Sequence, residues 1–506
     1  MNAQTKLSAA KADERVDVLI VGAGISGIGM AAHLQMMCPG KSFALIERRA
    51  ELGGTWDLFR YPGIRSDSDM HTLGFIFEPW KHEKSIADGP AILEYLNRIV
   101  DERGIRPRIR FNRKVVAADW HGESACWQVT LEDEAGTRSM VLANWLYLGS
   151  GYYDYDDPYD AQIPGREDFA GHVLHPQFWP RDLDYKGKRV VVIGSGATAV
   201  TIVPAMASGG AAHVTMLQRT PTWYGVRPAK DALANFLRKI LPEKVAYAIT
   251  RKKNVFMQDW VFKMARNKPE KVKQALTKRT RKALGAKYDP VAFTPPYNPW
   301  EQRLCLVPDG DMFEAIKAGK AEVVTDHIDR IDATGIQLKS GRHLDADVIV
   351  TATGLRLAVA GKIAVSVDGK PVNWADHFYY KGAMFSNVPN LSAVFGYLNA
   401  SWTLRADIIS EYVCKVLNHM DKVGASVAIP VLPENHGLVE DDIFDFSSGY
   451  IQRGKHIMPR NAVDLPWRLN QDYRKDREDL KRLPIDDGVL VFGKARVSTP
   501  ELEAAE

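Results

Sequence analysis

Hydrophobic and polar positions follow two different periods at the start of the chain. Residues 16–21 form a short apolar run of the kind that makes a buried strand. Glycines interrupt the run, and apolar residues then recur at helical spacing to about Met37. A second apolar run covers residues 42–46. The pattern predicts a strand, a tight turn, a helix and a second strand, and it is too broken by glycine to span a membrane.

The turn after the first strand reads Gly22-Ala-Gly24-Ile-Ser26-Gly27. The first glycine permits the turn, the second lets backbone approach a pyrophosphate, and the third lets helix pack on strand. The helix N-terminus offers unpaired N–H groups to phosphates. Glu47 ends the second strand 20 residues after Gly27, where a carboxylate can accept from a ribose 2′-OH. We therefore expect a dinucleotide here; a purely structural glycine turn is the alternative.

The same pattern returns in the middle of the chain. Residues 189–193 and 213–218 are further strand-like runs. The turn between them reads Gly194-Ser195-Gly196-Ala-Thr198-Ala199 and opens another helical pattern. A second dinucleotide site is therefore expected.

The two units differ at one informative position. The residue 25 places after the first glycine is Glu47 in the first unit and Arg219 in the second. A carboxylate would repel a 2′-phosphate, whereas Arg219 with Thr220 beside it can pair with one. The second site is therefore expected to prefer NADPH over NADH. The alternative is that Arg219 is an ordinary surface charge.

Two dinucleotide sites in one chain indicate electron transfer between two cofactors. A nicotinamide that delivers hydride and a flavin that accepts it would divide this chemistry, so the first site is expected to hold FAD. A third strand-like run, residues 347–351, ends in the small-residue turn 352–354, which lets backbone lie near a cofactor. The expected fold class is α/β, with two Rossmann-like domains, the second inserted in the first, and a helical insertion.

A length of 506 residues is about three times the usual domain size of 100 to 200. We expect an FAD-binding domain of residues 1–150 and 382–506 and an NADPH-binding domain of residues 151–226 and 291–381. The helical insertion is residues 227–290. The polar ends, residues 1–15 and 495–506, are expected to fray.

The net charge of +4 hides an uneven distribution. Between Arg227 and Lys287 there are 18 Lys or Arg and 4 acids, a net charge of +14, which leaves −10 for the rest. Apolar residues at helical spacing accompany the basic ones. This segment is either a solvated basic face or a surface attracted to an anionic membrane. No nucleic-acid-binding motif accompanies it, so no nucleic-acid partner is expected.

The four cysteines, Cys38, Cys126, Cys305 and Cys414, are scattered and form no CxxC or metal-type pair. Neither a metal site nor disulfide exchange is expected. The N-terminus lacks the apolar core of a signal peptide. These features predict a cytoplasmic protein.

Between the two units the chain reads Phe169-Ala-Gly171-His-Val-Leu-His175-Pro-Gln-Phe-Trp179-Pro180. This segment resembles, at every fixed position, the FxGxxxHxxxWP fingerprint of Baeyer–Villiger monooxygenases. Related flavin-containing monooxygenases, which oxygenate amines and sulfides, typically end the fingerprint differently. The resemblance extends at least from residue 16 to about residue 402. His175 is expected to be a hydrogen-bonded anchor between domains rather than a proton shuttle.

A second block, residues 53–69, also resembles this family. The resemblance implies that Gly54 and Thr55 lie against the flavin, that Trp56 covers it, and that Asp67 is the active-site aspartate. The sequence Asp-Leu-Phe after Trp56 most resembles the branch of ethionamide-activating bacterial enzymes, which take ketones and also oxidise sulfur. The strand of residues 110–117 should pass beneath the FAD adenine, with Val115 offering backbone contacts.

The resemblance further implies that Arg303 is the active-site arginine. The preceding position, a lysine in many members, is Gln302, which leaves Arg219 and Thr220 to hold the 2′-phosphate. Cys305 has no evident histidine partner and is expected to be a buried structural thiol rather than a nucleophile.

The activity implied is conversion of ketones to esters or lactones with NADPH and O2 through a flavin C4a-peroxide. Arg303 would stabilise the developing negative charge, and Asp67 would orient it. The first alternative is S- or N-oxygenation, with a thioether or amine as substrate. More distant alternatives are a non-oxygenating pyridine-nucleotide reductase and a nucleotide-binding or membrane-associated module without enzymatic activity.

Overall fold

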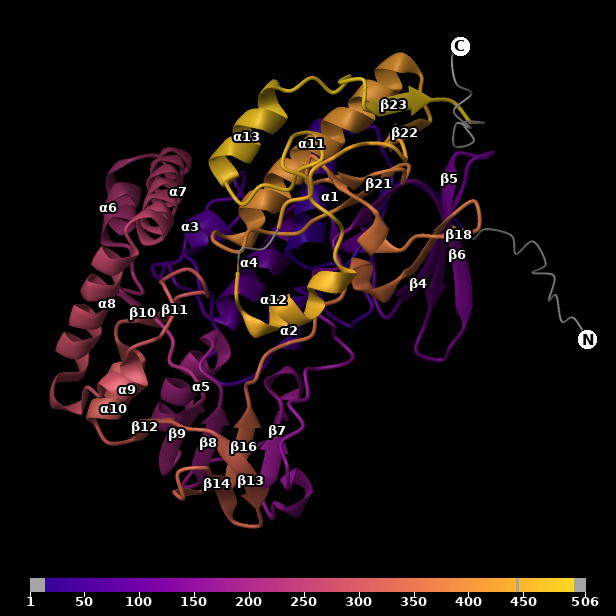
Figure 1. The fold of residues 1–506 in the computed structure, drawn as a ribbon. Helices are drawn as coiled ribbons and strands as arrows, with labels where there is room; N and C mark the ends of the chain where they lie inside the picture. The colour runs from indigo at the N-terminus through magenta and orange to yellow at the C-terminus, as the bar shows by residue number, and fades with distance from the viewer. Residues whose placement is uncertain (1–13, 443–445, 496–506) are drawn as a thin grey trace, which may run out of the picture.

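The computed structural model describes residues 14–442 and 446–495. Two sheets with helices packed on them form two lobes, and a set of long helices runs along one flank (Figure 1). The expected α/β class is confirmed by this arrangement. Most of the ends that were expected to fray, residues 1–13 and 496–506, lie outside the described residues.

Nine strands of the described chain form the first sheet, in the order β18-β17-β4-β5-β6-β1-β2-β3, with β21 also paired to β6. Their bounds are β1 (Glu14–Val21), β2 (Phe43–Ile46), β3 (Ile109–Arg110), β4 (Lys114–His121), β5 (Cys126–Glu132), β6 (Arg138–Leu148), β17 (Ala364–Val367), β18 (Lys370–Pro371) and β21 (Leu391–Ala393). β1 lies in the middle and pairs in parallel with β2 and β6. Its side chains alternate between two cores, because successive residues of a strand point to opposite faces.

One face of this sheet is covered by α1 (Ile25–Met37), α4 (Gly89–Glu102) and α11 (Trp402–Val423). α1 packs along α11, the helix that returns from the far end of the chain. Val18 and Ile20 of β1 point into this helical layer, and Leu19 points to the opposite core. The strand and helix expected from the first 50 residues are therefore confirmed.

The strand expected over residues 110–117 is in fact two strands. β3 ends at Arg110 and pairs with β2, whereas β4 begins at Lys114 and pairs with β5. Asn112 lies between them with a φ of 52°, a left-handed conformation that breaks a strand. The apolar pattern alone does not show this break, because Asn tolerates the conformation without a glycine signal.

Five parallel strands form the second sheet, in the order β12-β9-β8-β16-β7. Their bounds are β7 (His172–Leu174), β8 (Arg189–Ile193), β9 (His213–Gln218), β12 (Ala321–Thr325) and β16 (Val348–Thr351). The helices α5 (Ala197–Ser208) and α10 (Asp311–Lys317) pack on one face, and the antiparallel strands β13 (Ile328–Asp332), β14 (Gly335–Leu338) and β15 (His343–Asp345) pack on the other. The second Rossmann-like unit is thus present as expected.

The boundary expected at residue 381 needs correction. β17 and β18 fall in the range assigned to the second domain, yet β17 pairs in parallel with β4 of the first sheet. The chain has therefore re-entered the first sheet by Ala364. This pairing covers the edge that β4 would otherwise expose, a long-range requirement that no local pattern signals.

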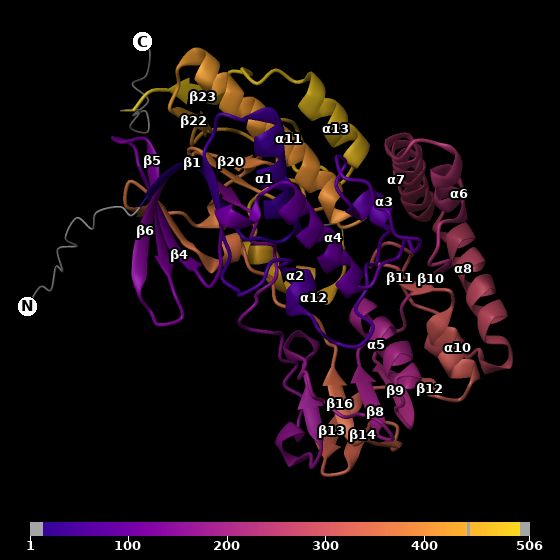
Figure 2. The same cartoon turned by 180° about the vertical axis from the view of Figure 1, so that it is seen from behind.

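Residues 227–290 form mainly helices, as expected. The long elements are α6 (Ala232–Ile240), α7 (Glu243–Asn267) and α8 (Pro269–Leu284), followed by the short α9 (Pro290–Phe293). They lie along one side of both lobes in the front and back views (Figures 1 and 2). The strands β10 (Tyr224–Arg227) and β11 (Cys305–Pro308) pair at the base of this insertion, where the chain leaves and returns.

The remaining elements are short. They are α2 (Thr55–Leu58), α3 (Met70–Leu73), α12 (Gly449–Gly454), α13 (Tyr473–Arg482), and the strand pairs β19 (Tyr379–Tyr380) with β20 (Met384–Phe385) and β22 (Val427–Pro430) with β23 (Leu490–Gly493). Within the described ranges, every helix is too short or too polar to serve as a membrane span.

A buried charge network fastens α7 to the first lobe. The Arg251 guanidinium lies 3.2 Å from the Asp407 carboxylate of α11 and donates to the Gly74 carbonyl at 2.7 Å. Asp407 also lies 3.3 Å from Nε2 of His33 on α1 and accepts from the backbone N–H of Ile76. One buried carboxylate therefore ties three helices together.

Replacing Asp407 with Ala is expected to lower the free energy of unfolding by about 3–5 kcal/mol, because it leaves the Arg251 charge buried and unpaired. Urea unfolding followed by far-UV circular dichroism measures this change. The matched control is Asp421→Ala, which breaks an exposed pair with Lys41 and should cost less than about 1 kcal/mol. Equal losses in the two variants would contradict the structural role of Asp407.

Candidate active site

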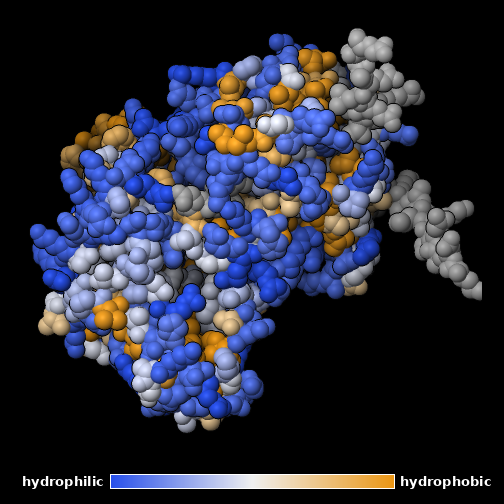
Figure 3. Space-filling model, in the orientation of Figure 1, coloured by the Kyte–Doolittle hydropathy of each residue, from blue (hydrophilic) through white to orange (hydrophobic). Residues whose placement is uncertain are grey.

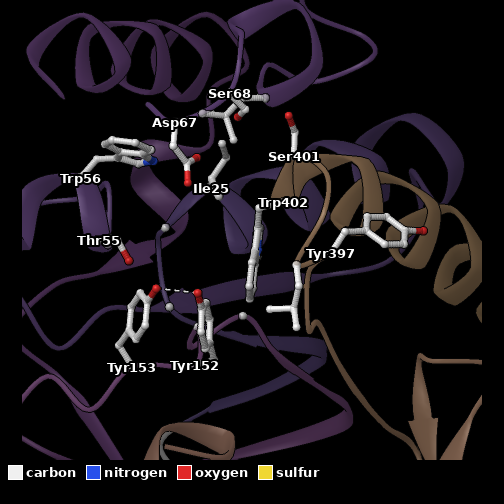
Figure 4. A pocket seen from close by; sticks show the side chains of 18 of the residues that line it. Ile25, Thr55, Trp56, Asp67, Ser68, Tyr152, Tyr153, Tyr397, Ser401 and Trp402 are labelled. Carbon is white, nitrogen blue, oxygen red and sulfur yellow. Dashed lines mark hydrogen bonds between the residues drawn. The ribbon is translucent and has the colours of Figure 1, made fainter. Parts of the chain in front are cut away.

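A cavity of about 800 Å³ lies where the first lobe, the second lobe and α7 meet. Its walls come from the turn after β1, the segment around α2, the end of β6, α7, β11 and the start of α11. Figure 4 shows Trp56 and Asp67 at one side of this space and Tyr152 and Trp402 at another. Most residues expected to hold FAD line it: Gly22, Gly24, Ser26, Glu47, Gly54, Thr55, Trp56, Asp67 and Val115.

Two glycines of the first turn, Gly22 and Gly27, are required by backbone conformation and close backbone contacts. Gly22 has a φ of +95°, which favours glycine. A Cβ on Gly27 would lie 1.9 Å from the Gly22 carbonyl oxygen, and one on Gly24 would lie 3.5 Å from the Cα of Gly54. Gly24 is the N-cap of α1 and supplies no side-chain cap, so the first N–H groups of the helix are available to an anion.

Glu47 lies at the end of β2 with only 4% of its surface exposed. Its two carboxylate oxygens accept from the backbone N–H groups of Ala23 at 2.8 Å and Arg49 at 2.9 Å. Burial raises the pKa of Glu47, although these two hydrogen bonds oppose the rise. Each oxygen keeps a second lone pair toward the cavity, so the residue fits a ribose hydroxyl.

Tyrosine side chains that the sequence did not single out form one wall of the cavity together with Trp402. The Tyr152 and Trp402 rings stack at 5.0 Å between centroids, and Trp402 Nε1 donates to Ser26 Oγ at 2.8 Å. The Tyr152 and Tyr153 hydroxyls are 2.5 Å apart (Figure 4). Tyr155 lies 3.1 Å from the hydroxyl of Thr55. The available signal was the Tyr-rich run directly after the end of a central strand, where ligands bind in α/β sheets.

Arg303 and Asp67 lie side by side in this cavity, although they are 236 residues apart in the chain. The family resemblance described above requires this contact. The Arg303 guanidinium donates to Asp67 Oδ2 at 2.9 Å. Burial disfavours the charged guanidinium, but the nearby Tyr450 hydroxyl and Asp67 carboxylate raise the pKa of Arg303 well above its ordinary value. The arginine therefore remains a cation.

Three residues of the cavity wall each carry a buried polar atom that has no hydrogen-bond partner among the described residues: Arg303 Nε, Trp300 Nε1 and Gln258 Oε1. An unpaired buried donor or acceptor costs about 1–3 kcal/mol. These three groups therefore destabilise the cavity wall locally.

The basic helix α7 contributes to the cavity, which its charge pattern did not indicate. Asn254 and Gln258 donate to the two carboxylate oxygens of buried Asp69 at 2.8 and 3.1 Å. Met257 and Val261 line the same space. The expectation of an accessory insertion is therefore too narrow, because one face of α7 belongs to the site.

The second glycine turn forms a separate, open site. The Ser195 hydroxyl donates to the Thr220 carbonyl at 2.9 Å, so the turn after β8 and the end of β9 are held together. Gly196 caps the N-terminus of α5, lies exposed and has open space where a Cβ would project. Arg219 is also exposed and makes no ion pair or hydrogen bond with another described residue. A free cation beside an open helix N-terminus fits a phosphate-bearing ligand.

The first turn of α5 also carries the other two residues expected at this site. They are Thr198 and Ala199. The Thr198 side chain hydrogen-bonds Tyr61, and burial raises the pKa of Tyr61 to about 12. Ala199 is buried in the core of the second lobe. Neither residue lines the large cavity.

The fingerprint segment makes structural contacts outside the large cavity. His175 Nε2 lies 3.3 Å from the Gly354 carbonyl at the end of β16, and Nδ1 accepts from the Gln177 backbone. Burial lowers the pKa of His175, which favours the neutral ring. A Cβ on Gly171 would lie 2.4 Å from the Asp347 carbonyl oxygen. These contacts fix β7 against β16 and provide no acid or base for the cavity.

The other fingerprint residues contribute mainly packing. Phe169 packs on the face of the second sheet beside β13, and Trp179 packs against the opposite core of that sheet. Pro180 follows directly and is partly exposed.

Cys305 lies between the two sites but is not a nucleophile. Its thiol contacts the Ser195 carbonyl at 3.5 Å and the Thr222 hydroxyl at 3.6 Å. Burial raises the pKa of the Cys305 thiol to about 11, so the reactive thiolate is scarce near neutral pH. The contact with Ser195 links the second turn to the wall of the cavity.

Comparison with known proteins shows which family the chain belongs to. Residues 19–293 match the family described as pyridine nucleotide-disulphide oxidoreductase. The chain is 49% identical over 482 residues to the FAD-containing monooxygenase EthA of Mycobacterium tuberculosis, covering 95% of this chain and 98% of that protein. The chain belongs to the FAD-containing monooxygenases. The probable FAD-binding monooxygenase AlmA of Acinetobacter baylyi is 47% identical over 483 residues, covering 95% of this chain and 97% of that protein.

Solved structures share the fold of this FAD-containing monooxygenase. An oxidised steroid monooxygenase bound to NADP superposes with a TM-score of 0.73 at 21% identity, covering 95% of this chain and all of that one. Cyclohexanone monooxygenase bound to ε-caprolactone gives 0.72 at 20% identity, with the same coverage of each chain. The disulphide chemistry in the name of the matched family has no counterpart among the four cysteines, which are all buried and free.

The close approach at Gly27 can be tested in this monooxygenase. Gly27→Ala places a methyl group against the Gly22 carbonyl and should displace the first turn of α1, so the purified protein is expected to lose most of its FAD. The ratio of flavin to protein absorbance measures this loss. Gly40→Ala is the matched control, because nothing lies within 4 Å of its Cβ position. Full flavin content in both variants would contradict the role of the first glycine turn in holding FAD.

Proposed function

We propose that this FAD-containing monooxygenase is a Baeyer–Villiger enzyme, which converts small ketones to esters or lactones with NADPH and O2. The observation that carries the proposal is the Arg303–Asp67 pair, a cation held in the cavity that the FAD cradle borders. The fold supports it, because a steroid monooxygenase and cyclohexanone monooxygenase share the arrangement of both lobes.

The residues present fit both cofactors. FAD, when bound, would take hydride from the nicotinamide and activate O2 for insertion beside a carbonyl. The first turn and the start of α1 would hold its pyrophosphate, Glu47 its ribose, and the segment around α2 with Trp56 its ring system. We assign residues 1–150 and the C-terminal part to this domain, and the second sheet to NADPH.

Arg303 would act as the electrostatic catalyst. Conversion of a ketone to an ester passes through negatively charged oxygen, and a preorganised cation in a site with little water stabilises such charge. Asp67 accepts one N–H of the guanidinium, which fixes the orientation of that group. Loss of one such donor typically lowers turnover by about 100- to 1,000-fold.

The remaining cavity wall would shape the substrate site. The stacked Tyr152 and Trp402 rings and the α7 side chains Met257 and Val261 give it apolar surface, which suits a carbonyl compound with an apolar body. We expect the enzyme to work in the cytoplasm on a small molecule, without a nucleic-acid partner.

Arg303→Ala is expected to retain FAD but to form ester about 100- to 1,000-fold more slowly. NADPH oxidation should continue and yield hydrogen peroxide. Gas chromatography of the ester, with parallel peroxide measurement, tests this. Arg330→Ala, which breaks an exposed Arg–Asp pair of similar geometry with Asp168, is the matched control and should behave as wild type. Normal ester yield from Arg303→Ala would overturn the assignment.

The same variant separates the proposal from S-oxygenation. A thioether is itself the nucleophile, so its oxidation gains little from a cation that stabilises an anionic oxygen. Sulfoxide formation by Arg303→Ala should therefore fall by less than about 10-fold, well below the loss expected for ester. Equal loss of ester and sulfoxide would instead assign Arg303 a general role in cofactor use.

We propose that Arg219, with Thr220, binds the NADPH 2′-phosphate. Arg219→Ala removes a hydrogen bond between charged groups, worth about 1.5–3 kcal/mol, so the KM for NADPH should rise about 10- to 100-fold. The kcat should stay unchanged, and the KM for NADH serves as the internal control, because NADH lacks the phosphate. A parallel rise for both cofactors would contradict this role.

A further inference from the structure

The helical insertion exposes an unusual amount of apolar surface. Nine large apolar side chains between residues 233 and 261 are at least 40% exposed, out of 16 such side chains in the described chain. They are Leu233, Phe236, Ile240, Val245, Ile249, Phe256, Met257, Trp260 and Val261. An apolar patch is visible in the space-filling view at the upper left, where α6 and α7 lie (Figures 1 and 3). Such a concentration marks an interaction surface rather than scattered surface residues.

The exposed side chains lie in stripes along the helices. On α6 they are spaced three and four residues apart, at Leu233, Phe236 and Ile240. On α7 the positions 245, 249, 256 and 260 fall within a narrow sector at 100° per residue. The buried face of α7, with Arg251 and Asn254, points the other way. α7 therefore has an inner face that is satisfied by the protein and an outer apolar stripe that is not.

Basic side chains flank these stripes. Lys239, Lys244 and Lys252 are exposed, and none of them forms an ion pair with another described residue. They belong to the segment whose net charge is +14. A helix pair with an apolar stripe and a basic border is typical of surfaces that lie in the headgroup region of an anionic bilayer.

A groove beside α7 combines apolar and basic side chains in the same way. Its volume is about 940 Å³, and it lies between α7 and α13, with Phe77 and Phe256 among its apolar lining residues. Its charged residues are eight basic and one acidic, namely Arg103, Lys244, Arg251, Lys252, Arg474, Arg477, Lys481, Arg482 and Glu478. Arg477, Lys481 and their neighbours can contact phosphate groups while the apolar floor accepts acyl chain.

The geometry points to a docking surface for an anionic phospholipid bilayer, formed by α6, the outer stripe of α7 and the groove along α13. This surface borders the active-site cavity, because Met257 and Val261, on the side of α7 that adjoins the outer stripe, line the cavity and are 45% and 40% exposed. Under the proposed function, an apolar substrate dissolved in the bilayer would be concentrated beside the helix that lines the active-site cavity.

The positive charge of this surface favours an anionic bilayer over a second copy of the chain as the binding partner. A two-fold dimer places the same patch on both partners, so each +14 segment would face the other. Like charges across an interface oppose association, whereas an anionic membrane complements them.

The test uses the purified holoenzyme with two kinds of vesicle, one of phosphatidylcholine alone and one with part of it replaced by phosphatidylglycerol. Sedimentation should carry the protein down with the second kind only, and added salt should weaken binding. The triple variant Lys239→Glu, Lys244→Glu and Lys252→Glu should bind at least about 100-fold more weakly. The control variant Lys186→Glu, Lys339→Glu and Lys370→Glu changes exposed lysines outside the insertion and should bind as wild type.

A second variant removes apolar surface without changing charge. Phe236→Ser, Phe256→Ser and Trp260→Ser should also abolish binding, whereas Val291→Ser, Val439→Ser and Val463→Ser, exposed elsewhere, should not. Flavin absorbance and turnover of a water-soluble ketone confirm that each variant is folded, and they test the proposed function separately. Equal binding to both vesicle types, equal binding by patch and control variants, or a lipid-free dimer that the patch variants dissociate would overturn the proposal.

Discussion

The buried contact between Asp407 and Arg251 holds the active-site architecture together. A carboxylate and a guanidinium removed from water are stable only when both are paired, so their positions constrain each other strongly. Asp407 belongs to α11 of the first lobe, and Arg251 to the basic insertion. Their contact fixes α7 against the FAD cradle, which allows Asn254 and Gln258, one turn or two further along, to reach Asp69 and complete the cavity wall.

This anchoring explains how one helix serves three environments. The inner side of α7 is polar and buried, the adjoining side contributes Met257 to the cavity, and the outer side presents Phe256 and Trp260 to the surroundings. The overall hydrophobic pattern of α7 is therefore weak, because apolar residues lie on more than one face. A helix of this kind looks like a basic, solvated segment when its sequence is considered alone.

The second lobe reaches the cavity through a narrow set of contacts. Cys305 on β11 touches the backbone of the second glycine turn at Ser195, and Arg303 lies two residues before it. The cation in the cavity and the open helix N-terminus that suits NADPH are thus on connected segments. His175, bonded to the Gly354 carbonyl, anchors the edge of the same lobe. The fingerprint motif stabilises the lobe's packing, while the residues that we propose for the chemistry lie outside the motif.

The amino-acid sequence by itself determined both glycine turns, the strands and helices around them, and the helical character of residues 227–290. These features depend on local constraints: a positive φ, a Cβ that would clash, and an apolar period. The site pair Arg303 and Asp67 came from resemblance to a family, since nothing local joins residues 236 positions apart. Only the tertiary structure decided the edge pairing of β17, the Tyr152–Trp402 stack and the place of α7 in the cavity wall. Each of these depends on burial and pairing between distant segments, which become defined only when the chain is packed.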